Sequence, residues 1–269
     1  MDDIYVRLGG FNIKISFDHA RKLDPKLDFV RKRLQMDVFL YLKSFVVLKK
    51  ARKVDFKIVF ISHPEIEIIK TTKTAKEYVF LLERISDKKI LVDLLISTYQ
   101  FEAVLKDIIF SLLQKNGGFG IHASSVKFGR GAYLFLGSSG AGKSTIADLL
   151  SVKYNVISDD MTILRKIKGK YYIFQMPFLE KVWWGQKTQE MYELKKVLFL
   201  NKSRAFSIKK LADNELITQN ILSQILAAQN LDRKKTKEIF SFIQTFRNYY
   251  SLYFDRDEKR LLKFIRGLK

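Results

Sequence analysis

The sequence contains no cysteine, so the chain can form neither a disulfide nor a thiolate zinc site. This composition fits a reducing compartment, and we expect the cytoplasm. The opening residues, MDDIYVRLGG, lack the basic segment and apolar core of a signal peptide. Apolar runs are short because charged residues such as Lys43 interrupt them, and none approaches the ~20 residues that cross a membrane. We therefore predict a cytoplasmic chain without a membrane span.

Acidic side chains are also scarce, since 28 of them face 49 basic ones and leave a formal net charge of +21. Such an excess can indicate binding to nucleic acid or to an acidic membrane surface. The basic residues are spread along the chain and are mostly lysine, whereas readers of nucleic acid rely on arginine. We interpret most of the charge as solvated surface. An acidic protein or peptide is an expected partner, and nucleic acid stays an alternative.

The sequence contains one complete binding motif, at residues 137–144. Residues 137–144, GSSGAGKS, match G-x-x-x-x-G-K-[ST], with an apolar run at 132–136 before them and an amphipathic segment at 144–151 after them. This is the strand–loop–helix context of a phosphate loop, in which backbone N–H groups and the helix N-terminus bind phosphates. In such a loop Lys143 reaches the β- and γ-phosphates and the Ser144 hydroxyl joins the Mg²⁺ shell. The predicted nucleotide-binding residues are Gly137, Ser138, Ser139, Gly140, Ala141, Gly142, Lys143, Ser144 and Thr145.

Two adjacent carboxylates, Asp159 and Asp160, follow a short apolar strand at 155–158. At the carboxyl end of a strand in an α/β sheet, such side chains face the crevice where ligands bind. They leave the backbone on opposite sides, so one can contact Mg²⁺ while the other takes a proton. An isolated Asp-Asp pair is more often a turn or a helix cap. The neighbouring phosphate loop favours the catalytic interpretation.

His122 lies at the head of the strand that precedes the loop strand. A histidine with no other ligand or partner nearby in the sequence is more often structural than functional. The order of His122, a small hairpin, an apolar strand, the phosphate loop and Asp159-Asp160 resembles the catalytic core of the HPr kinase/phosphorylase family. The resemblance covers about residues 117–210, including KKVLFLNK at 195–202. The matching residues are His122, Gly137, Gly140, Gly142, Lys143, Ser144, Asp159 and Asp160.

The resemblance implies an α/β fold with a mixed sheet, related to the phosphoenolpyruvate-carboxykinase type of phosphate-loop fold. It implies that Asp159 deprotonates a serine hydroxyl, with His122 and Lys143 near the transferred phosphate, and that Ser144 and Asp160 hold Mg²⁺. It also allows a homo-oligomer. The family carries a further metal-binding carboxylate in a glycine-containing segment that is not found here.

The corresponding segment of this sequence reads FQMPFLEKVWWG, in which Glu180 is the only acid. The resemblance therefore does not assign a role to Glu180, nor does it imply HPr as acceptor or a phosphorylase half-reaction. The adjacent Trp183-Trp184 could stack on a base or grip a peptide, and buried packing is the simpler account.

Hydrophobic patterning predicts two domains. Residues 1–97 read as a mainly β N-terminal domain, with strand-like VDFKIVFIS at 54–62. No motif in this domain indicates chemistry, and we expect a structural, regulatory or substrate-docking role. From Ser97 the period becomes helical, and residues 98–269 form the predicted nucleotide-binding kinase domain. Beyond Leu211 the chain reads as entirely helical, with Tyr249 and Tyr250 in the helix that contains Ile239.

Taken together, these features predict an ATP- and Mg²⁺-dependent kinase that transfers the γ-phosphate to a hydroxyl, first of all a serine of a small protein or peptide. Two alternatives stay open. One is a small-molecule kinase, for example of free serine, which differs only in its acceptor. The other is a nucleotide-dependent switch or nucleic-acid-binding NTPase that uses the basic surface. The sequence does not decide between ATP and another phosphoryl donor.

Overall fold

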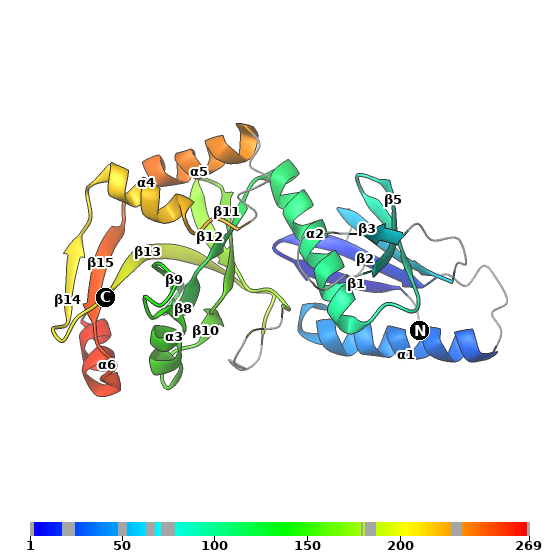
Figure 1. Cartoon of the computed structure of the whole chain (residues 1–269), viewed down its shortest axis with the longest axis horizontal. Helices are drawn as coiled ribbons and strands as arrows, with labels where there is room; N and C mark the ends of the chain where they lie inside the picture. Colours follow the sequence, from blue (N-terminus) through cyan, green and yellow to red (C-terminus); the bar gives the residue numbers. More distant parts are fainter. Residues whose placement is uncertain are drawn as a thin grey trace. The chain divides into compact units, whose positions relative to one another are not determined.

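The computed structural model describes residues 3–17, 25–47, 53–62, 68–70, 79–178, 180, 187–226 and 233–267. The chain divides into two compact units, Met1–Leu112 and Leu113–Lys269, and each contains both helices and strands (Figure 1). Helix α2 (Thr98–Asn116) begins directly after the predicted boundary at residues 97/98, and the division between the units falls within it. The chain is thus of the α/β class with mixed sheets.

The first unit contains one six-stranded sheet in the order β1-β2-β3-β6-β5-β4. Its elements are β1 (Ile4–Leu8), β2 (Phe11–Phe17), α1 (Pro25–Leu42), η1 (Lys43–Phe45), β3 (Phe56–Ile61), β4 (Ile68–Lys70), β5 (Val79–Ser86), β6 (Lys89–Asp93) and the first part of α2. Strands β2 and β3 are parallel, so the chain between them must cross over, and it does so through α1. The region predicted as mainly β therefore also holds an 18-residue helix, which buries Leu34 and Val38 at helical spacing.

The second unit is built on one sheet in the order β10-β8-β9-β13-β12-β11-β7, and β15 and β14 extend it from β13. Its elements are β7 (Phe119–His122), β8 (Ser124–Phe128), β9 (Gly131–Leu136), α3 (Lys143–Ser151), β10 (Val156–Ser158), β11 (Met161–Ile167), β12 (Lys170–Phe174), β13 (Met191–Lys202), β14 (Ser207–Lys210), α4 (Asn214–Leu222), α5 (Arg233–Thr245), β15 (Tyr249–Phe254) and α6 (Glu258–Arg266). The hairpin between β11 and β12 turns at Lys168-Gly169, both with positive φ.

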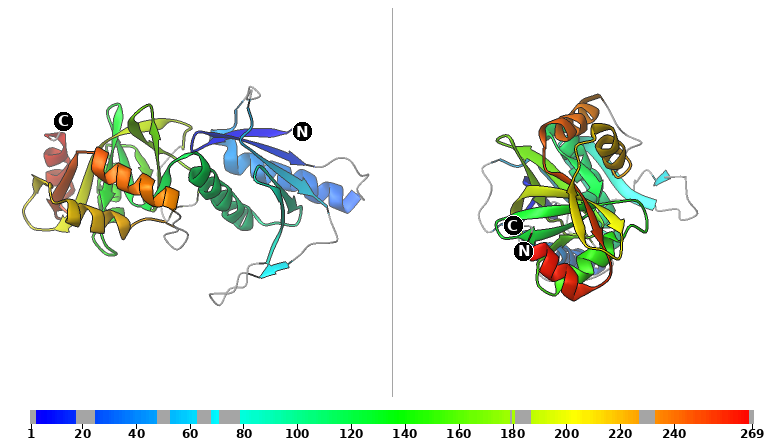
Figure 2. Two further views of the ribbon diagram at one scale, coloured as in Figure 1. Left: turned by 90° about the horizontal axis from the view of Figure 1, so that it is seen from above. Right: turned by 90° about the vertical axis from the view of Figure 1, so that its left-hand side faces the viewer.

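Helices cover both faces of this sheet. Strand β9 shows why, since all six of its residues are buried and alternate between two cores. Leu134 and Leu136 belong to the core that α4 and α5 complete, whereas Phe135 belongs to the core that α3 and α6 complete. The right-hand view of Figure 2 shows α4 and α5 on one side of the sheet and α3 and α6 on the other. Among the described residues, no helix combines the length and apolar character that a membrane crossing requires.

The prediction of an all-helical region beyond Leu211 is wrong for residues 249–254. Helix α5 ends at Thr245, and YYSLYF forms β15, which lies parallel to β13 and antiparallel to β14. Tyr249 and Tyr250 continue the spacing of the preceding helix, which explains the misassignment. Aromatic residues favour a pleated, half-buried surface, and pairing with strands on both sides satisfies the backbone of β15.

Candidate functional site

The phosphate loop, residues 137–142, connects β9 to α3 as predicted. Gly140 (φ 78°) and Gly142 (φ 104°) adopt left-handed conformations that glycine accepts without strain. A Cβ atom on Gly142 would also lie 3.0 Å from the ring of Phe254 on β15, and one on Gly137 would lie 2.6 Å from Cβ of Ala141. Three glycines of the motif are therefore required by backbone conformation or by space.

Lys143 is the first residue of α3 and is only 8% exposed. Its Nζ atom donates hydrogen bonds to the carbonyl oxygens of Gly137 (2.8 Å) and Ser138 (3.4 Å). The ammonium group thus lies within the loop, where the amides of the first helical turn also point. Both features attract an anion to the same place.

Strand pairing brings Asp159 to the edge of the sheet where the loop begins. Strand β8 is antiparallel both to β10, with Ser125 opposite Ser158, and to β9, with Ser125 opposite Leu134. Strands β9 and β10 are therefore parallel, and their carboxyl ends meet at one edge. Since neighbouring strands lie ~4.8 Å apart, the backbone at Asp159 is about 10 Å from the end of β9.

A buried network of hydroxyl groups holds the backbone beneath the two carboxylates. The Ser158 hydroxyl lies 2.8 Å from that of Ser125 and 2.5 Å from that of Thr162. The Ser124 hydroxyl donates to the backbone carbonyl of Asp159 at 3.2 Å. All four hydroxyl side chains are buried. The position of the Asp pair is consequently fixed by hydrogen bonds across three strands.

The two carboxylates differ in exposure. Asp159 is buried, with 2% of its surface exposed. The side chain of Asp160 is 54% exposed, and its Oδ1 atom lies 3.6 Å from Nδ1 of His122. This contact follows from the pairing of β7 with β11, which sets Met161 opposite His122. The structure therefore brings His122 and the Asp pair together.

A third carboxyl group, Glu180, lies beside the pair. It accepts a hydrogen bond from the backbone N–H of Asp159. Burial raises the pKa of Glu180 to about 7; the Lys187 ammonium opposes this shift, and the charge of Asp159 adds to it. The Nζ atom of Lys187 lies 3.8 Å from Oε1 of Glu180 and also donates to the carbonyl of Phe178. The sequence offered no periodicity from which this contact could be predicted, and Trp183-Trp184 lie outside the described residues.

The sequence predicts Mg²⁺ at this site, held by Ser144 and Asp160. Within the described ranges, no three His, Asp or Glu side chains gather closely enough to hold a metal ion by themselves. Mg²⁺ at sites of phosphoryl transfer is bound through one or two carboxylates together with phosphate oxygens and water. The Ser144 hydroxyl and the Asp160 carboxylate are oxygen donors of this kind, and they are the residues that would hold the ion.

The fold and the site define an α/β protein with a phosphate loop. Within that class the chain belongs to the ScmC family, because the family model described as "SynChlorMet cassette protein ScmC" matches residues 79–252, more than half of the chain. The matched segment contains the phosphate loop, His122, Asp159 and Asp160. No curated protein matches the sequence.

Among solved structures, the chain is similar to the HPr(Ser) kinase/phosphatase from Coxiella burnetii, at 12% sequence identity and a TM-score of 0.30. The alignment covers 55% of this chain and 95% of that one. The structural resemblance to that protein is distant, and the family shown by the sequence is ScmC.

Proposed function

We propose that this protein is an ATP- and Mg²⁺-dependent kinase that transfers the γ-phosphoryl group to a hydroxyl, foremost a serine of a small protein or peptide. One observation carries the proposal: the phosphate loop and Asp159 lie at one edge of the sheet, where the backbone at Asp159 is about 10 Å from the end of β9. This spacing leaves room for a phosphoryl group and an acceptor hydroxyl between them.

Binding of the triphosphate falls to the loop. The amides of residues 137–142 and the N-terminus of α3 neutralise phosphate charge, and Lys143 exchanges the carbonyls of Gly137 and Ser138 for phosphate oxygens. Ser144 and Asp160 hold Mg²⁺, which when bound neutralises charge on the β- and γ-phosphates. His122 lies beside Asp160 and can hold that carboxylate in place.

Asp159 acts on the acceptor. Its carboxylate takes the proton of the hydroxyl as the hydroxyl oxygen bonds to the γ-phosphorus, and the bond from that phosphorus to the bridging oxygen breaks to release ADP. Burial of Asp159 beside Glu180 keeps water away from the transferred group and so favours transfer over hydrolysis. The acceptor serine must therefore enter a largely enclosed site.

The net charge of +21 supports an acidic protein or peptide as the source of that serine. A free metabolite with a hydroxyl group would use the same residues, so the acceptor alone distinguishes the two kinds of kinase. A nucleotide switch that binds nucleic acid would need no acceptor other than water.

The test uses purified protein, Mg²⁺ and γ-labelled ATP, with cell extract, free serine and water as parallel acceptors. Asp159→Asn is expected to retain nucleotide binding and to lower transfer about 10²–10⁴-fold, because a general base is lost. Asp148→Asn, which changes an exposed carboxylate on α3, is the matched control and should match wild type. Label on one discrete protein supports the proposal, and label on serine indicates a metabolite kinase. Phosphate release alone, stimulated by nucleic acid, would establish the switch instead.

A further inference from the structure

A cavity of about 370 Å³ lies against the phosphate loop. Gly140, Gly142 and Thr145 line one side of it, and residues 202–204 and 254–256 line the other. The two latter segments follow the carboxyl ends of β13 and β15, which are parallel to each other and to β9. The cavity therefore opens at the same edge of the sheet as the phosphate loop and Asp159.

The order of strands along this edge places the cavity opposite the carboxylates. It runs β10, β8, β9, β13, β15, so the loop that follows β9 has Asp159 on one side and the cavity on the other. In a phosphate loop, Lys143 reaches the β- and γ-phosphates while the loop amides cradle the α- and β-phosphates. If the γ-phosphate faces Asp159, the α-phosphate and the nucleoside must extend toward the cavity.

The chemistry of the lining suits a nucleoside. Lys202, Arg204 and Arg256 are exposed cations at the cavity. They can donate hydrogen bonds to ribose and base oxygens or nitrogens, and a guanidinium plane can stack on a base. The volume lies within the range of about 300–1,000 Å³ that is usual for small-molecule sites. Phe254, whose ring lies against Gly142, fixes the floor of the cavity relative to the phosphate loop.

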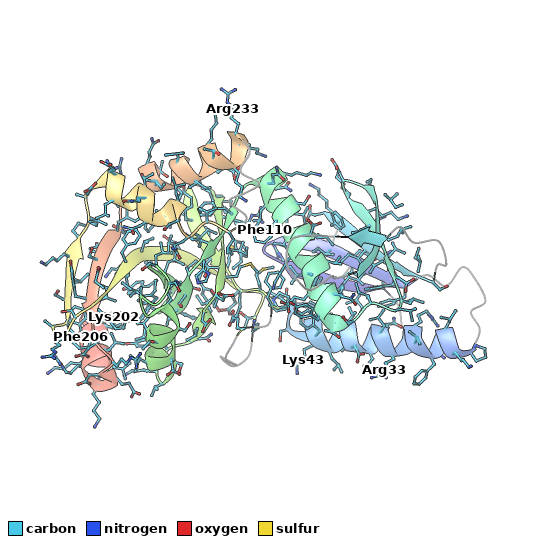
Figure 3. The ribbon with its side chains drawn as sticks, in the orientation of Figure 1. Arg33, Lys43, Phe110, Lys202, Phe206 and Arg233 are labelled. Carbon is cyan, nitrogen blue, oxygen red and sulfur yellow. The ribbon has the colours of Figure 1, made fainter. Side chains whose placement is uncertain are left out.

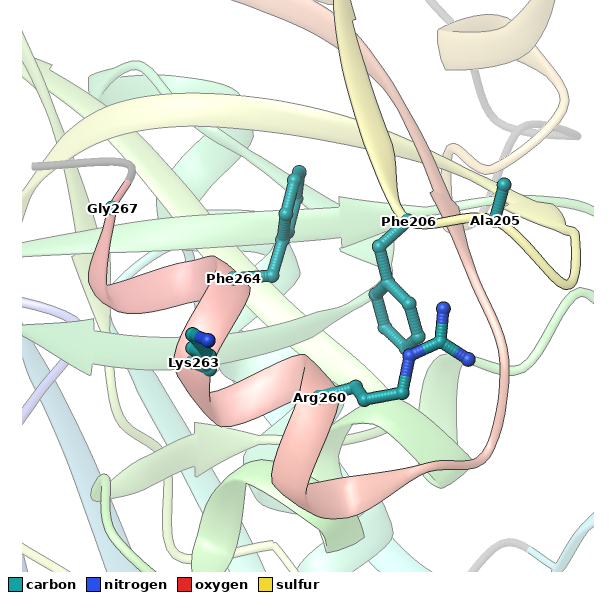
Figure 4. Close-up of a pocket in the computed structure, with 6 residues that line it drawn as sticks. All are labelled: Ala205, Phe206, Arg260, Lys263, Phe264 and Gly267. Atoms are coloured by element: carbon teal, nitrogen blue, oxygen red, sulfur yellow. The ribbon is translucent and has the colours of Figure 1, made fainter.

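Arg260 on α6 holds the two lining segments together. It donates to the carbonyl of Arg204 (3.3 Å) and lies 3.4 Å from the Asp255 carboxylate. Its guanidinium also lies over the ring of Phe206, 4.9 Å from the centroid (Figure 4). Phe206 accordingly lies close to α6 (Figure 3). The hydrogen bonds and the ring contact of Arg260 thus hold one wall of the cavity in place.

A second, larger cavity of about 700 Å³ lies beyond Arg260, between the chain at Phe206 and the α6 residues Lys263 and Phe264 (Figure 4). No residue of the phosphate loop lines it. The smaller cavity is therefore the one that a nucleotide held by the loop can reach.

We propose that the 370 Å³ cavity, here called the nucleoside cavity, binds the ribose and base of the triphosphate donor. This inference rests on the proposed function, since it assumes that the phosphate loop holds a nucleoside triphosphate. It assigns donor recognition to Lys202, Arg204 and Arg256, which lie outside the phosphate-loop motif.

The test compares two ligands that share the phosphates but not the nucleoside. Binding of a non-hydrolysable ATP analogue and of inorganic tripolyphosphate, each with Mg²⁺, is measured by calorimetry for wild type, Arg256→Ala and Ser203→Trp. We expect wild type to bind the ATP analogue at least about 10-fold more tightly than tripolyphosphate. Each variant should lower the affinity for the ATP analogue about 10-fold, Arg256→Ala because a hydrogen bond to a charged group is lost and Ser203→Trp because the cavity is filled. The affinity for tripolyphosphate should change less than about twofold.

Two variants serve as controls. Arg266→Ala removes an exposed arginine of α6 that lines neither cavity, and it should change neither affinity. Lys143→Ala should lower the affinity for both ligands. Equal affinity of wild type for both ligands, or an unchanged affinity for the analogue in Arg256→Ala, overturns the nucleoside cavity while leaving the phosphate site intact. Failure of wild type to bind either ligand overturns the proposed function, and the inference with it.

Discussion

The two sides of the phosphate loop differ in burial and in charge. On the carboxylate side, formed by β8 and β10, Asp159 is buried above a hydroxyl network and lies against Glu180. On the cationic side, formed by the ends of β13 and β15, Lys202 and Arg256 are exposed around an open cavity. Bond-making benefits from excluded water, whereas a donor that enters and leaves needs access. In the proposed kinase, this contrast would separate phosphoryl transfer from donor exchange along one sheet edge.

Lys143→Ala should break this contrast most strongly, because Lys143 belongs to neither side and acts on the phosphates between them. We expect the rate of phosphoryl transfer to fall about 10²–10³-fold, comparable with loss of one charge-stabilising donor, together with weaker ATP binding. Transfer of label and calorimetric affinity measure the two effects. Lys153→Ala, an exposed lysine just beyond α3, is the control. Equal ATP affinity in these two variants would contradict the assignment of Lys143.

Glu180→Gln tests the carboxylate side through the pH dependence of the free energy of unfolding. Burial raises the pKa of Glu180 from 4.5 to about 7. Between pH 4.5 and 7, the folded state therefore keeps a proton on Glu180 that the unfolded state has already lost. The free energy of unfolding of wild type should therefore decrease as pH rises from 5 to 8, by at most about 2–3 kcal/mol from this group. Urea denaturation at four pH values should show that Glu180→Gln removes this decrease.

Glu190→Gln is the matched control for that measurement. Hydrogen bonding to Tyr192 and the charge of Lys127 lower the pKa of Glu190, so its contribution is present above its usual pKa and is lost only at lower pH. Between pH 5 and 8 it should leave the slope of wild type unchanged. A slope that persists in Glu180→Gln would show that another group is responsible.

Thr162→Val should have the smallest effect and probes the rigidity of the carboxylate side. The change keeps the shape of the side chain but removes the hydroxyl that contacts Ser158 and donates to the carbonyl of Ala123. Leaving these buried groups without their partner should lower the free energy of unfolding by about 1–3 kcal/mol. Thr218→Val, at a half-buried position of α4 where the hydroxyl makes an exposed hydrogen bond to the carbonyl of Asn214, should cost much less. Equal costs in the two variants would show that the network is not stabilising.

Much of the loop and its neighbours follows from local sequence. The motif at 137–144, the strand before it and the helix after it are specified within about 20 residues, so this local structure could be predicted directly. The family resemblance implied that His122 lies near the transferred phosphate, and the contact of His122 with Asp160 was found only in the structure. The roles of Asp159, Asp160 and His122 stay predictions.

What the sequence could not show depends on long-range pairing. Residues 202–204 and 254–256 meet only because β15 pairs in parallel with β13, and neither segment carries a motif. The spacing of aromatic residues around Tyr249 matched that of a helix, so the sequence predicted a helix where the structure has β15. Glu180 reaches Asp159 through a segment without regular structure, where periodicity gives no information.

The place of β15 has a consequence for biosynthesis. Phe254 lies against Gly142, and Lys202 pairs with Phe254 across β13 and β15. Residues 137–145 leave the ribosome well before residues 249–254. A nascent chain can therefore carry the complete phosphate-loop motif before it contains the residues at 254–256 that line the neighbouring cavity. In the proposed kinase, full affinity for nucleotide would therefore arise only once β15 has been translated and has docked, which would delay catalysis until the second unit has folded.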